Sequence, residues 1–115
     1  MQTTILTDKQ YRILSRKLIN TIDAKCRIIP VNTLKSAKYI LKKPVYITLE
    51  KEKDVIIASL DDIEAFAYAD TEFEAINLLC EEIIHLYEDL VDDRNNLGIL
   101  PQKWLQYLEE VLDRK

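Results

Sequence analysis

The sequence predicts an α+β protein with a three-stranded antiparallel sheet and one long packed helix, flanked by an N-terminal and a C-terminal helix. Two observations predict the sheet. Apolar and polar residues alternate from Val45 to Glu50, and an apolar run rich in β-branched residues extends from Val55 to Leu60. The third observation is a capping box at Thr71, which opens a long apolar stripe at helical spacing. With 115 residues, 48% of them apolar, the chain has the size and composition of one domain.

The first expected element is a helix from about Asp8 to Asp23, for which Thr7 or Asp8 can cap the free N–H groups. Spacings of three and four residues place its apolar side chains on one face, with most basic side chains off that face. The apolar residues are Tyr11, Leu14, Leu18 and Ile22, and the basic residues are Lys9, Arg12, Arg16 and Lys17.

The next segment is harder to assign. Cys26 to Val31 is a short β-prone run that ends near Pro30. Asn32 to Lys43 is basic and has no clear periodicity, so the sequence leaves its order open. Pro44 argues against a helix that continues up to it, because a residue before proline avoids helical geometry.

Three strands are expected between Val45 and Ala69. The alternation that begins at Val45 predicts a half-buried strand. The apolar run from Val55 to Leu60 predicts a more buried central strand, and two aspartates end it. Ile63 to Ala69 alternates less cleanly and is expected to form the third strand, with Phe66 and Tyr68 on one face.

A long amphipathic helix should follow and end near Asp92. In its capping box, Thr71 accepts a hydrogen bond from the backbone N–H of Glu74. Asn95 to Gly98 supplies turn residues, and Pro101 then suits the first turn of a last helix. The apolar stripe of the long helix consists of Ile76, Leu79, Ile83, Leu86 and Leu90, and that of the last helix of Trp104, Leu105, Leu108, Val111 and Leu112.

The stretch from Val45 to Leu90 resembles the HicB-like antitoxin family. It reads VYITLEKEKDVIIASLDDIEAFAYADTEFEAINLLCEEIIHLYEDL, and its strongest local match is the turn before the helix, ADTEFEA. Asp70, Thr71, Glu74 and Ala75 match the family's G-D-T-x-x-E-A motif, whereas Ala69 stands where the family usually has glycine. The resemblance implies a truncated ribonuclease-H-like fold of three antiparallel strands and a helix. It also implies an antitoxin role.

The sequence departs from that family in two places. Leu60 to Glu64 lacks the proline and glycine of the family's corresponding segment. The family's C-terminal DNA-binding part is not recognisable either, and a basic N-terminal extension and a Trp-containing C-terminal helix are present instead. These departures leave the antitoxin role as an inference from likeness of fold.

The two parts of the chain carry opposite net charges. Residues 1–43 carry ten basic and two acidic residues, a net charge of +8. Residues 44–115 carry six basic and eighteen acidic residues, a net charge of −12, so the whole chain has a net charge of −4. Either the two parts neutralise each other in the fold, or the basic part meets nucleic acid or an acidic partner. The expected division of the single domain, residues 1–115, is a basic N-terminal helix and arm (1–43), a HicB-like βββα core (44–92) and a C-terminal helix (93–115).

Signatures of catalysis and of metal binding are weak. His85 has Glu81 and Asp89 four residues away on either side, a spacing that suits local charge pairs as well as a metal. The lone glycine excludes glycine-rich phosphate loops, and no nucleophile motif is present. We therefore expect no catalytic residue, no metal ligand and no cofactor. The alternative is a degenerate ribonuclease-H-like, metal-dependent nuclease that uses Asp61, Asp62 and Glu64.

The leading functional interpretation is a non-catalytic interaction protein that neutralises a small ribonuclease-type toxin and also contacts operator DNA. An acidic body suits a toxin with a basic, RNA-binding groove. An orphan structural or adaptor dimer is the third interpretation. The expected partner-binding residues are Glu81, Glu82, Glu88, Asp89 and Trp104, and the expected nucleic-acid-binding residues are Lys35, Lys38, Lys42 and Lys43.

The sequence also leads to expectations about the oligomeric state and the cellular compartment. Uncovered sheet edges and the helix of Trp104 favour a homodimer. No segment reaches the ~20 consecutive apolar residues of a membrane-spanning helix. The start of the chain lacks the layout of a secretory signal, and Cys26 and Cys80 have no disulfide or zinc spacing, so a reducing cytoplasm is expected.

Overall fold

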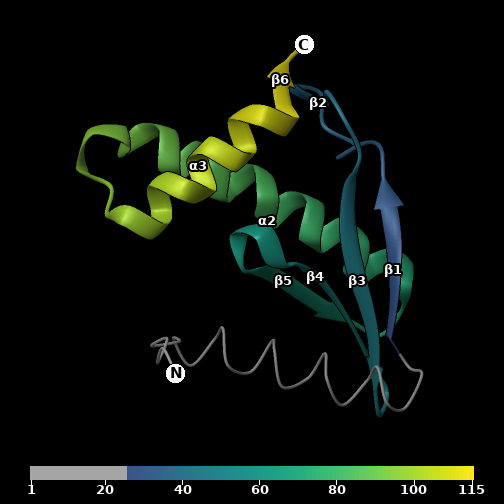
Figure 1. Ribbon diagram of the computed structural model, residues 1–115. Helices are drawn as coiled ribbons and strands as arrows, with labels where there is room; N and C mark the ends of the chain where they lie inside the picture. Colours follow the sequence, from purple (N-terminus) through teal and green to yellow (C-terminus); the bar gives the residue numbers. More distant parts are fainter. Residues whose placement is uncertain (1–25) are drawn as a thin grey trace.

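The computed structural model describes residues 26–115 and has an α+β fold (Figure 1). The helix expected from Asp8 to Asp23 lies outside these residues. The elements in chain order are β1 (Cys26–Val31), β2 (Tyr39–Leu41), β3 (Val45–Glu52), β4 (Val55–Leu60), η1 (Asp61–Ile63), β5 (Ala65–Ala69), α2 (Glu72–Asp92), η2 (Arg94–Asn96), α3 (Ile99–Val111) and β6 (Leu112–Arg114).

The main sheet has four antiparallel strands in the order β1-β3-β4-β5, so the expectation of three strands was wrong. The β-prone run before Pro30 forms the additional strand. It pairs with β3 from Cys26 opposite Glu50 to Val31 opposite Val45. Pro30 is tolerated there because β1 is an edge strand, where a missing N–H need not break a ladder on both sides.

Strands β3 and β4 occupy the two central positions of the sheet, and the buried end of β4 confirms the expected central strand. β3 is more buried than the half-buried strand that alternation predicted, because Thr48 and Glu50 on its polar side are buried as well as Ile47 and Leu49. The third expected strand, Ile63 to Ala69, was placed too early. Asp61 to Ile63 form the 3₁₀ turn η1, and Glu64 then adopts a left-handed backbone with φ of 55° before β5 begins. Only the remaining five residues are therefore extended and able to pair with β4.

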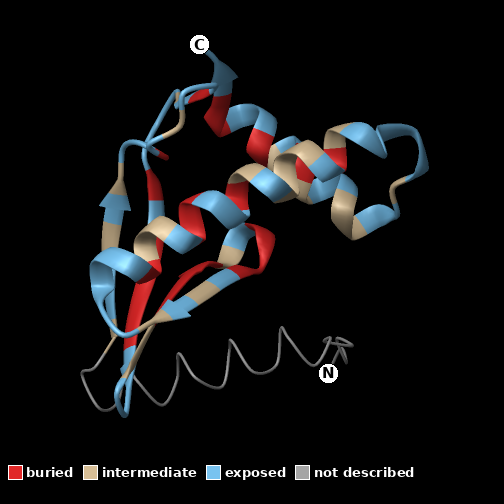
Figure 2. Ribbon diagram, turned by 180° about the vertical axis from the view of Figure 1, so that it is seen from behind, coloured by how far each residue is buried: buried red, intermediate tan, exposed pale blue. Residues whose placement is uncertain are grey.

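Helix α2 follows the prediction closely. Thr71 is its N-cap and accepts a hydrogen bond from the backbone N–H of Glu74, with a nitrogen–oxygen distance of 3.2 Å. Leu79 and Ile83 are buried, and α2 packs across β4 and β5. Figure 2 shows buried and exposed residues alternating along this helix, and the buried middle of the sheet behind it.

The C-terminal part differs from the prediction in two ways. Helix α3 begins at Ile99, two residues before Pro101, which sits inside the first turn. The chain then leaves the helix as β6, which pairs antiparallel with β2 in a second, two-stranded sheet. The segment between β1 and β3 is consequently held by α3 and β6, through Lys42 N to Val111 O at 2.7 Å and Lys115 N to Lys38 O at 2.9 Å.

Candidate protein-binding surface

The exposed side of α2 is acidic. Seven Asp and Glu residues lie between Glu72 and Asp92, and no Lys or Arg interrupts them. The stripe of Leu79 and Ile83 faces the sheet, so helical geometry turns the acidic positions to solvent. The exposed residues on this side are Glu74, Leu78, Glu81, Glu82, His85, Asp89 and Asp92, which we call the acidic face of α2.

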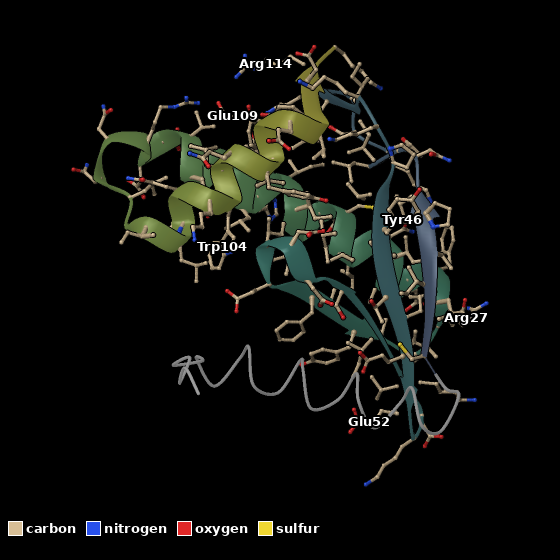
Figure 3. The ribbon with its side chains drawn as sticks, in the orientation of Figure 1. Arg27, Tyr46, Glu52, Trp104, Glu109 and Arg114 are labelled. Carbon is tan, nitrogen blue, oxygen red and sulfur yellow. The ribbon has the colours of Figure 1, made fainter. Side chains whose placement is uncertain are left out.

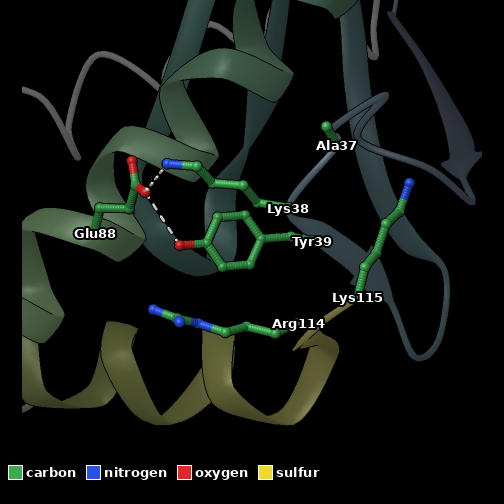
Figure 4. Close-up of a pocket in the computed structure, with 6 residues that line it drawn as sticks. All are labelled: Ala37, Lys38, Tyr39, Glu88, Arg114 and Lys115. Atoms are coloured by element: carbon green, nitrogen blue, oxygen red, sulfur yellow. Dashed lines mark hydrogen bonds and ion pairs between the residues drawn. The ribbon is translucent and has the colours of Figure 1, made fainter.

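Glu88 differs from the other predicted partner-binding carboxylates because it is only half-exposed and is held internally. Its Oε2 accepts a hydrogen bond from the hydroxyl of Tyr39 at 3.1 Å and lies 3.7 Å from Nζ of Lys38 (Figure 4). Tyr39 is buried and also meets Tyr87 edge to face, with the ring centroids 5.5 Å apart. A predicted partner-binding residue and a predicted nucleic-acid-binding residue thus contact each other.

The other three lysines of the predicted nucleic-acid site also contact the helices. Nζ of Lys35 donates to the side-chain oxygen of Asn77 at 3.0 Å and lies 4.4 Å from the ring centroid of Phe73, both on α2. Nζ of Lys42 donates to the backbone carbonyl of Glu109 at 3.0 Å, near the end of α3.

Lys43, the last of these lysines, forms an ion pair with α3, with Nζ 4.0 Å from Oε2 of Glu110. Cations near the carboxyl end of a helix are favoured by its dipole. Of the four lysines, Lys38 and Lys43 thus face carboxylates of α2 and α3, whereas Lys35 and Lys42 contact neutral groups, and each of these contacts is exposed and individually weak.

Trp104, the remaining predicted partner-binding residue, lies in the first half of α3 and is half-buried against the hydrophobic core (Figure 3). It lies on α3, whereas the other predicted partner-binding residues lie on α2. Its exposed part leaves it able to contribute contact area, but core packing accounts for most of its surroundings.

The acidic group between β4 and β5 has structural contacts. Asp62 accepts a hydrogen bond from Tyr107 of α3, and burial, followed by the charge and hydrogen bond of Asp62, raises the pKa of Tyr107. Asp61 is half-buried and Glu64 is buried. Within residues 26–115, His, Cys, Asp and Glu side chains do not gather in groups of three that could hold a metal ion, at this turn or around His85.

Sequence reasoning missed the pocket around Tyr39. Its lining residues come from β2, α2, β6 and the residues that adjoin the two strands: Ala37, Lys38, Tyr39, Glu88, Arg114 and Lys115. Figure 4 shows Arg114 and Lys38 on either side of the Tyr39 ring. The pocket depends on the pairing of β2 with β6, two three-residue strands that lie far apart in the sequence. A local sequence pattern does not predict such a pairing.

Comparison with protein-family models, with curated proteins and with solved structures finds no match to this chain. Among the helices of residues 26–115, none has the length and apolar character needed to cross a membrane.

Proposed function

We propose that the protein acts by binding a partner protein through the acidic face of α2, in the manner of the HicB-like antitoxins that the stretch from Val45 to Leu90 resembles. The observation that carries the proposal is the concentration of exposed carboxylates on one side of one helix, with no intervening Lys or Arg. The proposed partner is a small basic toxin of the ribonuclease type.

The dimensions of α2 suit such an interface. A helix of 21 residues is ~30 Å long, and a stable protein interface buries ~800 Å² on each partner. Leu78 and Phe73 are large exposed apolar residues on or beside the acidic face, so they add apolar contact area. Carboxylates around apolar anchors fit a basic groove, and charge complementarity of this kind accelerates association and selects the partner.

The role of the basic segment follows from its contacts. Lys35, Lys38, Lys42 and Lys43 each contact α2 or α3, two of them through ion pairs, which favours an internal structural role over binding of operator DNA. DNA binding is tested by titrating the full chain with the DNA that flanks its own gene. If the lysines bound phosphates, affinity would fall steeply with salt, and their replacement by Glu would abolish it.

Two experiments distinguish the nuclease and adaptor interpretations from the antitoxin proposal. In the nuclease interpretation, adding a divalent metal to the pure protein would produce RNA cleavage that Asp62→Asn abolishes. In the adaptor interpretation, light scattering would find a dimer with no toxin partner. The free edges of the main sheet available for such a dimer are those of β1 and β5.

Co-expression tests the main proposal. Each small protein encoded beside this gene is expressed alone and together with this chain. We expect one of them to arrest growth, to cleave RNA and to be neutralised in a complex that co-purifies. Normal growth with every neighbouring product, together with no complex, would refute the antitoxin proposal.

A further inference from the structure

The pocket around Tyr39 gathers basic side chains from two distant segments. Lys38 comes from the residue before β2, and Arg114 and Lys115 come from the end of β6 and the residue after it. Residues 44–115 contain six basic residues, and two of the six line this pocket. In a part of the chain with a net charge of −12, the pocket is therefore a local reversal of sign.

Strand pairing fixes this arrangement. Arg114 lies directly opposite Tyr39 in the pairing of β6 with β2. The same register continues to the next pair, because the backbone N–H of Lys115 donates to the carbonyl oxygen of Lys38 at 2.9 Å. Like charges on opposed positions of two strands repel each other. The backbone thus holds these cations together against their own repulsion.

The carboxylate of Glu88 lines the same pocket and is already engaged. It accepts the hydrogen bond of Tyr39 at 3.1 Å and lies 3.7 Å from Nζ of Lys38. Within the described part of the chain, the side chains of Arg114 and Lys115 are not paired with a carboxylate. Three basic side chains and one acidic side chain leave an excess of two positive charges in the pocket.

The ring of Tyr39 forms a fixed wall of the pocket. It is only 4% exposed, and its edge-to-face contact with Tyr87 and its bond to Glu88 hold it in place. Figure 4 shows the side chain of Arg114 extended along one side of this ring, with that of Lys38 on the other. A guanidinium suits phosphate, because its N–H groups can donate to two phosphate oxygens at once.

A second hollow adjoins the pocket. The two share Tyr39, Glu88 and Arg114 and have volumes of about 330 and 340 Å³. Sites for small molecules commonly have volumes of ~300–1,000 Å³. The second hollow is further lined by two partly apolar side chains and two carboxylates, Tyr87, Val91, Asp89 and Asp92. Carboxylates accept hydrogen bonds from hydroxyl groups, so this side suits the hydroxylated part of a ligand.

We propose that the pocket around Tyr39 binds a small phosphorylated compound with hydroxyl groups, such as a sugar phosphate or a nucleoside monophosphate. The phosphate lies against Arg114 and Lys115, and the hydroxyl groups face Asp89 and Asp92. A phosphate monoester carries about −2 at neutral pH, which matches the excess of positive charge. A nucleic acid is the less favoured ligand, because its further phosphates would meet these aspartates. The inference goes beyond the proposed function and does not depend on the partner of α2.

NMR titration of the full chain with ribose phosphate, at constant ionic strength, tests the proposal. We expect the backbone amide signals of Ala37 and Arg114 to shift and to saturate, whereas sodium chloride causes no such shift. Inorganic phosphate should bind more weakly, because it lacks the sugar hydroxyl groups that face Asp89 and Asp92. Equal affinities for the two compounds would overturn the assignment of a hydroxylated ligand.

Substitutions locate the site. Arg114→Gln with Lys115→Gln should weaken binding of ribose phosphate at least about tenfold, the loss expected when charged hydrogen bonds are removed. Both side chains are exposed, so the fold does not depend on them. Lys51→Gln with Lys103→Gln is the matched control, since it removes the same charge from exposed positions elsewhere.

Three further results would overturn the proposal. The first is the absence of a saturating shift with ribose phosphate in the unmodified chain. The second is equal binding by the Arg114 and Lys115 variant and by its control. The third is tighter binding of a short DNA duplex than of ribose phosphate through the same two residues, which would make nucleic acid the ligand.

Discussion

Tyr39 and Glu88 are joined by a hydrogen bond, with 3.1 Å between the phenol oxygen and Oε2, although 49 positions separate them in the sequence. The bond ties the short strand β2 to the second half of α2 and closes one side of the pocket lined by Arg114. It also fixes Glu88 in the fold, which distinguishes it from the freely exposed Glu81 and Asp89 on the same helix.

Replacing Tyr39 by Phe should reduce the free energy of unfolding by ~1 kcal/mol, because Glu88 loses a donor in a partly buried setting while the ring packing remains. Urea unfolding followed by circular dichroism measures the change. Tyr46→Phe is the control, since Tyr46 is exposed and should tolerate the change without loss. Equal stability of the two variants would contradict a structural role for the Tyr39–Glu88 bond.

Alkaline pH should weaken the fold through the same tyrosine. Burial, followed by the hydrogen bond and the charge of Glu88, raises the pKa of Tyr39 above its ordinary value of about 10. Because the folded state holds this proton more tightly, the contribution is complete below the unfolded-state pKa and is lost as pH rises through the folded-state pKa. Burial also raises the pKa of Tyr107 and of the Cys80 thiol, so both act in the same direction.

The measurement is the free energy of unfolding at pH 8 and at successive values above about 10, the ordinary tyrosine pKa. The unmodified chain should lose stability over this range. The variant with both Tyr39→Phe and Tyr107→Phe should lose less. Parallel curves for the two proteins would show that these phenols do not couple to folding.

The lysines of the basic segment should matter for stability. Lys38 and Lys43 each face a carboxylate of a helix, so replacing both by Glu turns attraction into repulsion and should lower the free energy of unfolding by about 1 kcal/mol in total. Lys51→Glu with Lys103→Glu is the matched control, because it makes the same change of charge at exposed positions elsewhere. A loss that is no larger than that of the control would leave these lysines free for an external ligand.

The N-cap of α2 gives a sharper local test. Thr71→Ala should destabilise the protein by ~1 kcal/mol, since the N–H of Glu74 loses its acceptor, while Thr71→Ser should retain most of the stability. Thermal unfolding of the three proteins ranks them. If the serine variant were as unstable as the alanine variant, the hydroxyl would not be the stabilising group.

Local patterns predicted the parts of this fold that depend on neighbours in the sequence. The capping box fixed the start of α2, and its stripe of Leu79 and Ile83 identified the buried side. The sequence did not predict that β1 would join the sheet or that β2 would pair with β6, because those pairings are decided by contacts between distant segments. The internal contacts of Glu88 and Lys38 went unpredicted for the same reason.

The candidate surface could be predicted in part. Helical spacing placed Glu81, Glu82 and Asp89 together on the exposed side of α2, where the structure has them. Spacing could not separate Glu88 from them, because its half-buried state arises from Tyr39, which approaches from β2. Contact with the distant Tyr39 therefore makes Glu88 different from the other carboxylates of α2, although all of them look equivalent in the sequence.

The central claim, that the acidic face of α2 binds the partner, is tested by calorimetric titration with the toxin identified by co-expression. The variant Glu81→Lys with Asp89→Lys is compared with Asp54→Lys and Asp113→Lys, which makes the same change of charge away from α2. We expect the α2 variant to bind at least about tenfold more weakly, a loss of ~1.4 kcal/mol, and the control to retain the affinity of the unmodified chain. Equal affinities for the two variants would contradict the claim.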